Sequence, residues 1–109
     1  MRHITAVNVL RQCRKEIADF PEEIRGEIAD AAARLEEGHM LSMPLSRALP
    51  SLGKGVHELR FKDRSGIYRV VYVLIGGEIV WFIHAFQKKT EKMPLANIEI
   101  VRKRLKEIR

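Results

Sequence analysis

The sequence has one cysteine among its 109 residues, so it contains little that can cross-link the chain or bind a metal ion through sulfur. Cys13 cannot form an internal disulfide, and its place in a helical apolar pattern predicts a buried core residue rather than a nucleophile. Internal repeats, phosphate-binding glycine loops and zinc-ligand spacings are also absent from the sequence. We therefore expect no metal ion and no cofactor.

Long hydrophobic runs are missing as well. No apolar run approaches the length of a membrane span, and the N-terminal residues lack the continuous apolar core of a secretory signal. Hydrophobic residues still make up 46% of the chain and charged residues 31%, which is typical of a soluble globular protein. A chain of this length forms one core but not two. We therefore expect a single cytoplasmic domain over residues 1–109 that is not bound to a membrane.

The positive charge is concentrated in the second half of the chain. Residues 1–53 contain seven Lys or Arg and eight Asp or Glu, whereas residues 54–109 contain thirteen and six. The halves therefore carry −1 and +7, which add to the net charge of +6. Such asymmetry favours a polyanionic partner such as a nucleic acid, bound through phosphate neutralisation and counterion release. An acidic protein would exploit the same field.

Residues 55–90 predict three consecutive antiparallel strands joined by two short turns. Gly76-Gly77 lies between two apolar runs and is typical of a two-residue hairpin turn, which requires positive φ angles. A two-residue turn places Ile75 opposite Glu78 and fixes the register of the pairs above them. These further pairs are Val73 with Val80, Val71 with Phe82 and Arg69 with His84.

Alternation along these strands separates an apolar face from a face with a cationic end. The apolar face is expected to carry Leu59, Phe61, Tyr68, Val70, Tyr72, Leu74, Ile79, Trp81, Ile83 and Ala85. The opposite face gathers five residues at the end farthest from the glycine turn, namely Arg60, Arg69, His84, Phe86 and Lys88. Because three strands converge there, we interpret this end as a site, the alternative being a set of solvated strand-end charges.

The segment before these strands predicts two helices. Residues 2–6 predict a short edge strand, and Asn8 is the expected N-cap of a helix that continues to Asp19. Pro21 opens a second helix that ends at Gly38. The two helices should form an α-hairpin that covers the apolar face of the sheet. The buried stripe expected on the second helix is Ile24, Ile28, Ala31 or Ala32, and Leu35.

The remaining segments flank the strands. Residues 39–54 carry two prolines, three serines and glycine and predict a long connection that delivers Lys54 near the cationic end. Pro94 is the expected first residue of a C-terminal helix. The apolar stripe of that helix is Leu95, Ile98, Val101, Leu105 and Ile108.

Three motifs in the second half occur in a specific order and spacing: HELRF at 57–61, YRVVY at 68–72 and HAFQKKT at 84–90. Together with the order of elements, they resemble the RelE/HigB superfamily of bacterial toxins, and most closely its phage-derived HigB-like branch. This resemblance implies an α+β fold of the RelE type, with an N-terminal α-hairpin packed on a small antiparallel sheet and a C-terminal helix.

The same resemblance implies a function. The protein would be the toxin of a type II toxin–antitoxin system, a ribosome-dependent mRNA endoribonuclease that inhibits translation. Its partners would be a cognate antitoxin, expected to be a small helix-turn-helix protein, and the ribosome with its mRNA. Two alternatives stay open, a gyrase-inhibiting toxin of the ParE type with the same fold and an RNA-binding module without catalysis.

The candidate catalytic residues suit metal-independent RNA cleavage, in which the ribose 2′-OH attacks the adjacent phosphate. Arg60 and Arg69 can stabilise the transition-state charge, because a guanidinium matches two phosphate oxygens. Truncating Arg69 should leave the fold intact, because we expect it at a polar sheet end. Lys88 and Lys89 are candidates for proton transfer, since crowding beside arginines lowers the pKa of a lysine. His84 could share that role, with a packed, hydrogen-bonded histidine as the alternative.

A second group of residues is expected to bind RNA without taking part in the reaction. Phe86 could stack on an unpaired base, although an aromatic residue at the rim of the core fits equally well. The expected RNA-binding residues are Lys54, Lys62, Arg64, Phe86 and Lys92. The chain departs from several relatives at Met93, because those relatives carry a tyrosine at the start of the last helix. The identity of the general acid therefore stays open.

Overall fold

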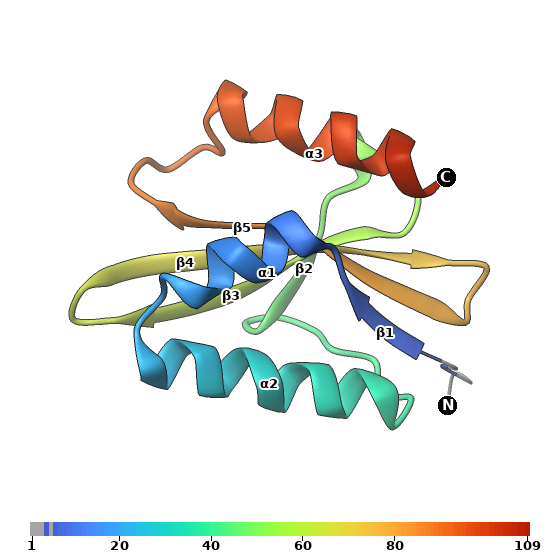
Figure 1. Cartoon of the computed structure of the whole chain (residues 1–109), viewed down its shortest axis with the longest axis horizontal. Helices are drawn as coiled ribbons and strands as arrows, with labels where there is room; N and C mark the ends of the chain where they lie inside the picture. The colour runs from blue at the N-terminus through green and yellow to red at the C-terminus, as the bar shows by residue number, and fades with distance from the viewer. Residues whose placement is uncertain (1–3, 5) are drawn as a thin grey trace.

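The structure is a computed structural model that describes residue 4 and residues 6–109. A five-stranded sheet with the order β1-β5-β4-β3-β2 forms the centre of the molecule, and α2 and α3 lie on its opposite sides (Figure 1). The chain therefore has the predicted α+β class. No described helix is long and apolar enough to span a membrane. The elements are β1 (Ala6–Val9), α1 (Arg11–Ala18), α2 (Glu22–Glu36), β2 (Ser46–Ala48), the 3₁₀ turn η1 (Pro50–Leu52), β3 (Val56–Asp63), β4 (Gly66–Ile75), β5 (Ile79–Lys88) and α3 (Leu95–Ile108).

The N-terminal strand differs from its prediction in position and direction. It spans Ala6–Val9 rather than residues 2–6, of which 2, 3 and 5 lie outside the described residues. It pairs in parallel with β5, so the sheet is mixed rather than wholly antiparallel. Asn8 belongs to this strand and is not an N-cap, because α1 begins only after Leu10.

The first helix lies along an edge of the sheet rather than over its face. The backbone N–H of Leu10 donates to the carbonyl of Phe82 and ends the pairing of β1 with β5. One turn into α1, the carboxylate of Glu16 accepts a hydrogen bond from the backbone N–H of Ala85, so a side chain satisfies a strand donor that β1 does not reach. The predicted α-hairpin is therefore divided between an edge helix and a face helix. α2 lies across the apolar face (Figure 1), and Cys13 of α1 reaches the same core from the edge.

The hairpin of β4 and β5 has a longer turn than predicted. Ile75 pairs with Ile79, so residues 76–78 form the turn, and both glycines in it have positive φ angles, 62° and 72°. The expected pairing of Ile75 with Glu78 is therefore wrong by one residue. A bulge between Val71 and Tyr72 then shifts the register again. Beyond the bulge, the pairs are Val71 with His84, Val70 with Ala85 and Arg69 with Phe86.

Each face of the sheet has its own core. The face toward α2 buries the two tyrosines as predicted, together with Cys13, the four expected positions of α2, Val80 and Phe82. Burial raises the pKa of the Cys13 thiol to about 12, in agreement with a structural role. On the face toward α3, Trp81 and Ile83 pack beside the buried residues Val56, Val71, Val73, Val101 and Leu105. Val80 and Phe82 have thus exchanged faces with Trp81 and Ile83 relative to the predicted register.

The connection after α2 contains structure that the sequence did not predict. Its residues 46–48 form β2, which pairs with residues 57–59 of β3. Its last residue, Lys54, lies beside the glycine turn, because Gly55 accepts a hydrogen bond from the backbone of Leu74, and Arg109 donates to the carbonyl of Lys54. The expectation that Lys54 lies near the cationic end is therefore wrong. It is separated from that end by the length of β3, about 20 Å at the rise of an extended strand.

Candidate functional site

Three arginines surround one buried carboxylate on the sheet face that also carries α3. Arg47 of β2 pairs with Glu58 of β3, and Arg60 of β3 pairs with Arg69 of β4, so all four side chains share that face. Oε2 of Glu58 lies 3.7 Å from Nε of Arg69 and 4.0 Å from Nε of Arg60. Glu58 is only 4% exposed. We call Arg47, Arg60, Arg69 and Glu58 the arginine cluster.

Arg69 is the deepest cation of the cluster. It is 5% exposed, and among the described residues no group accepts a hydrogen bond from its Nε. Its Nη1 donates to the carbonyl of Tyr68 at 3.2 Å. Burial lowers the pKa of Arg69 from its ordinary value, Glu58 opposes that shift, and Arg60 and Arg47 add to it. Arg69 is therefore buried at its polar sheet end, and its truncation would remove a partner of the buried Glu58 carboxylate, contrary to the expectation that the fold tolerates this change.

Arg60 connects the cluster to an open cleft. Its Nη1 donates to the sulfur of Met43 at 3.2 Å, and its backbone N–H donates to the carbonyl of Leu45, so the connection before β2 lies along β3. The cleft beside it has a volume of about 770 Å³. Its lining combines cationic, apolar and acidic side chains, namely Glu27, Met43, Pro44, Leu45, Arg60, Phe61, Lys62, Ile67 and Arg69.

Most of the predicted lysines lie at the same end of the sheet as Arg60 and Arg69. Lys62 and Lys88 both pair with Ile67, one row beyond the arginine pair, and Lys88 is half-buried there. Lys89 follows β5 directly and is exposed. Exposed positions are also occupied by Arg64, in the turn between β3 and β4, and by Lys92, in the connection to α3. Five of the predicted cations therefore extend the arginine cluster, and Lys54 does not.

His84 belongs to a buried polar network that joins three elements. Its Nδ1 lies 3.0 Å from Oε1 of Glu16 in α1, and its Nε2 lies 2.7 Å from Oδ1 of Asn97 in α3. Arg104 of α3 donates to the same carboxylate oxygen and to the carbonyl of Ile83, both at 2.8 Å. His84 is 3% exposed, so the network favours a packing role over contact with a substrate.

Phe86 is also withdrawn from the surface. It is 8% exposed, stacks on the ring of His84 with centroids 5.1 Å apart, and packs in the core under α3. A base cannot stack on a ring that both a histidine and a helix cover, so this position favours the core-rim interpretation of Phe86.

The sequence analysis did not identify two members of the site, Arg47 and Glu58. Arg47 lies in a segment with the turn composition of a connection, and β2 is too short for its alternation to be detected. Glu58 lies two positions before Arg60 on the same face of β3, but its contacts with two arginines depend on how β3 and β4 align. The one available signal was the pair of charged residues on that face of β3, Glu58 and Arg60, two positions apart.

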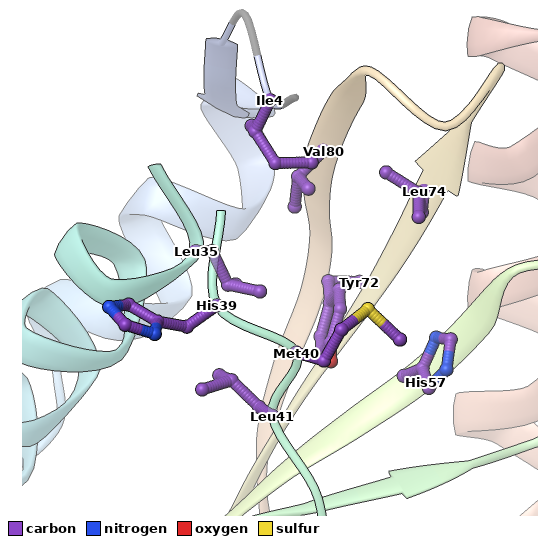
Figure 2. Close-up of a pocket in the computed structure, with 9 residues that line it drawn as sticks. All are labelled: Ile4, Leu35, His39, Met40, Leu41, His57, Tyr72, Leu74 and Val80. Atoms are coloured by element: carbon purple, nitrogen blue, oxygen red, sulfur yellow. The ribbon is translucent and has the colours of Figure 1, made fainter. Parts of the chain in front are cut away.

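A smaller pocket lies on the other face of the sheet. It has a volume of about 70 Å³ and is lined mainly by apolar side chains from the end of α2, the following segment and the sheet. Figure 2 shows Met40 and Tyr72 near His57 in this pocket, with Ile4 and Val80 at its other end. The ring of His57 stacks on Tyr72 with centroids 5.2 Å apart. Arg60 and Arg69 of the arginine cluster line the larger cleft, and no member of the cluster lines this pocket.

Comparisons with known proteins agree with the observed fold. The family model of phage-derived Gp49-like proteins (DUF891) matches residues 15–106. Comparison with curated proteins gave no significant sequence match. The chain is similar to a chain of the toxin–antitoxin complex RelBE2 from Mycobacterium tuberculosis, with 14% sequence identity and a TM-score of 0.55 over 81% of this chain and 100% of that chain. Two structures of the E. coli toxin RelE, a free double mutant and the isolated toxin, each match with 17% identity and a TM-score of 0.53 over 99% of both chains.

Proposed function

The chain belongs to the family of phage-derived Gp49-like proteins, and from this membership, its RelE-like fold and its arginine cluster we propose that it is the toxin of a toxin–antitoxin system. In this proposal it acts as a ribosome-dependent mRNA endoribonuclease and thereby inhibits translation. The observation that carries the proposal is the convergence of three arginines on Glu58, of which Arg60 and Arg69 line an open cleft. Lys62 and Lys88 lie at the same end of the sheet.

The cluster is suited to stabilise a phosphate whose negative charge increases during the reaction. Cleavage by the 2′-OH passes through a pentavalent phosphorus with additional charge on its equatorial oxygens. Guanidinium groups held in place by a buried carboxylate need little reorganisation as that charge develops. Arg60 is the partly exposed member of the two central arginines and is the first candidate for direct contact with the phosphate. Arg69, the more buried of the two, lies beside Arg60 on the neighbouring strand and adds its positive charge to the same site.

The protons must move through other groups. The attacking 2′-OH loses a proton, the departing 5′-oxygen gains one, and the products carry a 2′,3′-cyclic phosphate and a 5′-hydroxyl. Glu58 is a poor candidate for the base, because its carboxylate is buried and lies against Arg60 and Arg69. Lys88, half-buried in the row next to the arginines, is the better candidate for proton transfer. No metal ion takes part in this scheme.

The partners follow from the same proposal. The M. tuberculosis structure is named as a toxin–antitoxin complex, and we propose that this chain is likewise held inactive by a cognate antitoxin, a small helix-turn-helix protein. Acidic residues of the antitoxin would cover the cationic end of the sheet, so the complex should weaken as salt concentration rises. The other partners are the ribosome and its mRNA, in the cytoplasm.

The proposal is tested with ribosomes programmed with a defined message. We expect wild-type protein to cut the message on the ribosome, and 2′-O-methylation of the scissile nucleotide to block the cut. Arg60→Ala should lower the single-turnover rate by about tenfold to a hundredfold, the loss of one charge-assisted phosphate contact. Lys103→Ala, an exposed change on α3, is the matched control. Undiminished cleavage of the methylated message contradicts 2′-OH attack, and DNA damage without cleaved messages indicates the gyrase-inhibiting alternative.

A further inference from the structure

The cleft beside Arg60 and Arg69 is lined by both charged and apolar side chains. Arg60, Lys62, Arg69 and the acidic Glu27 carry charge, whereas Met43, Pro44 and Ile67 are apolar. Met43 is 56% exposed and Ile67 40%, and large apolar side chains of this kind are usually covered. Both side chains line the cleft that Arg69, the most buried arginine among the described residues, also lines.

A phosphate alone does not account for this lining. Guanidinium groups are sufficient to bind an anion, whereas exposed methionine and isoleucine side chains offer nothing to a phosphate and favour a flat apolar group. The volume of about 770 Å³ lies within the range of sites that bind small organic ligands. The ligand therefore has an anionic part and an apolar part, as a nucleotide does.

The charged and the apolar side chains of this cleft are close enough for a single nucleotide to contact both groups. Nη1 of Arg60 lies 3.2 Å from the sulfur of Met43, so a phosphate on the guanidinium and a base against the thioether are adjacent positions. Arg69 also lines this cleft, so its positive charge adds to that of Arg60 beside the anionic part of a ligand.

We infer that this cleft is a nucleotide subsite, in which the arginine cluster holds a phosphate of the RNA and Met43 and Ile67 contact the base next to it. This inference rests on the proposed function and adds a base-contacting element to it, the connection between α2 and β2. It replaces Phe86, which is buried, as the apolar partner of an unstacked base.

The inference is tested with messages that carry either adenine or an abasic ribose beside the scissile phosphate. On programmed ribosomes, Met43→Ala and Ile67→Ala should lower the cleavage rate of the adenine message by about tenfold, since removing apolar contact from a binding pocket weakens discrimination to that extent. On the abasic message the variants should cut as fast as wild type. Met40→Ala is the matched control, because Met40 lies in the same connection but lines the pocket on the other face. It should cut both messages at the wild-type rate.

Equal losses on the two messages, or the same loss in the control variant, would overturn the subsite. If wild-type protein cuts neither message, the proposed nuclease function fails, and binding then decides the inference separately. The probe is a hexanucleotide RNA with a single 2-aminopurine, compared with its abasic counterpart. Tighter binding of the 2-aminopurine RNA by wild type than by Met43→Ala supports the subsite, whereas equal binding of both RNAs, or no binding, overturns it.

Discussion

Replacing Glu58 by glutamine removes one negative charge from the centre of the arginine cluster and leaves its volume almost unchanged. The carboxylate lies 3.7 Å from Arg69 and 4.0 Å from Arg60, and all but 4% of its residue surface is buried. At an effective dielectric constant of about 20, each of these attractions is worth about 4 kcal/mol before desolvation is counted. Breaking a buried pair by removing one partner costs about 3–5 kcal/mol, because the other charge stays buried. We therefore expect Glu58→Gln to lower the free energy of unfolding by about 3 kcal/mol, since the amide can still hydrogen-bond.

The measurement is urea unfolding at neutral pH, followed by the fluorescence of Trp81, the one tryptophan of the chain. Glu99→Gln, at an exposed position on α3, is the control and should change the unfolding free energy by less than about 0.5 kcal/mol. Inorganic phosphate should stabilise Glu58→Gln more than wild type, because a bound anion replaces the missing carboxylate.

Two outcomes would refute this reasoning. A loss as small as that of the control would mean that Glu58 does not hold the arginines in solution. A large loss that persists when Arg69 is also replaced, in Glu58→Gln/Arg69→Met, would place the energy elsewhere, because removal of both partners should recover most of it.

Three further predictions concern the polar network, the lysines and a close backbone contact. Burial raises the pKa of Glu16, but hydrogen bonds from His84, Arg104 and the backbone of Ala85 outweigh it and leave the pKa below its ordinary value. The stabilisation by Glu16 is therefore present above a pH of about 4.5 and lost as pH falls through the folded-state pKa, so the stability difference between wild type and Glu16→Gln should narrow in that acidic range. In single-turnover cleavage, Lys88→Ala should cause the larger loss, about a hundredfold if it transfers a proton, and Lys89→Ala about tenfold; the reverse order would remove Lys88 from that role. A Cβ on Gly55, whose φ is 76°, would lie 2.5 Å from the carbonyl oxygen of Leu74, so Gly55→Ala should lower the unfolding free energy by about 2 kcal/mol in urea titrations, and an unchanged midpoint would contradict this.

The sequence analysis missed two register shifts, and these cancel each other beyond the bulge. The strand residues at the cationic end were therefore still assigned to the correct face. Counting a three-residue turn as two residues assigned residues 79–83 to the wrong face, because side chains alternate with a period of two. Ile83 is the extra residue of the bulge in β5, and it restores the predicted alternation from His84 onward. Phe86 and Lys88 therefore lie on the predicted face, although Arg69 pairs with Phe86 and not with His84.

What the sequence could not predict depends on contacts between distant segments. Glu16 and His84 are 68 positions apart, and no periodicity links a residue of an edge helix to the strand that the helix covers. Arg47 escaped because a three-residue strand gains its structure from pairing with β3 and not from its own pattern. The burial of Arg69 could not be predicted for a related reason, since its carboxylate partner Glu58 lies on the neighbouring strand β3.

The buried carboxylate therefore explains why a cluster of like charges can form in a small domain. Three guanidinium groups on adjacent strands repel one another, and desolvation adds to that cost for Arg69. A single Glu58 offsets part of both terms but leaves the cluster with excess positive charge and an unused donor on Arg69. In the proposed function, a phosphate bound at the cluster offsets this remaining positive charge. The same feature that lowers the stability of the free protein thus favours binding of a polyanion, and most strongly a phosphate whose charge is increasing.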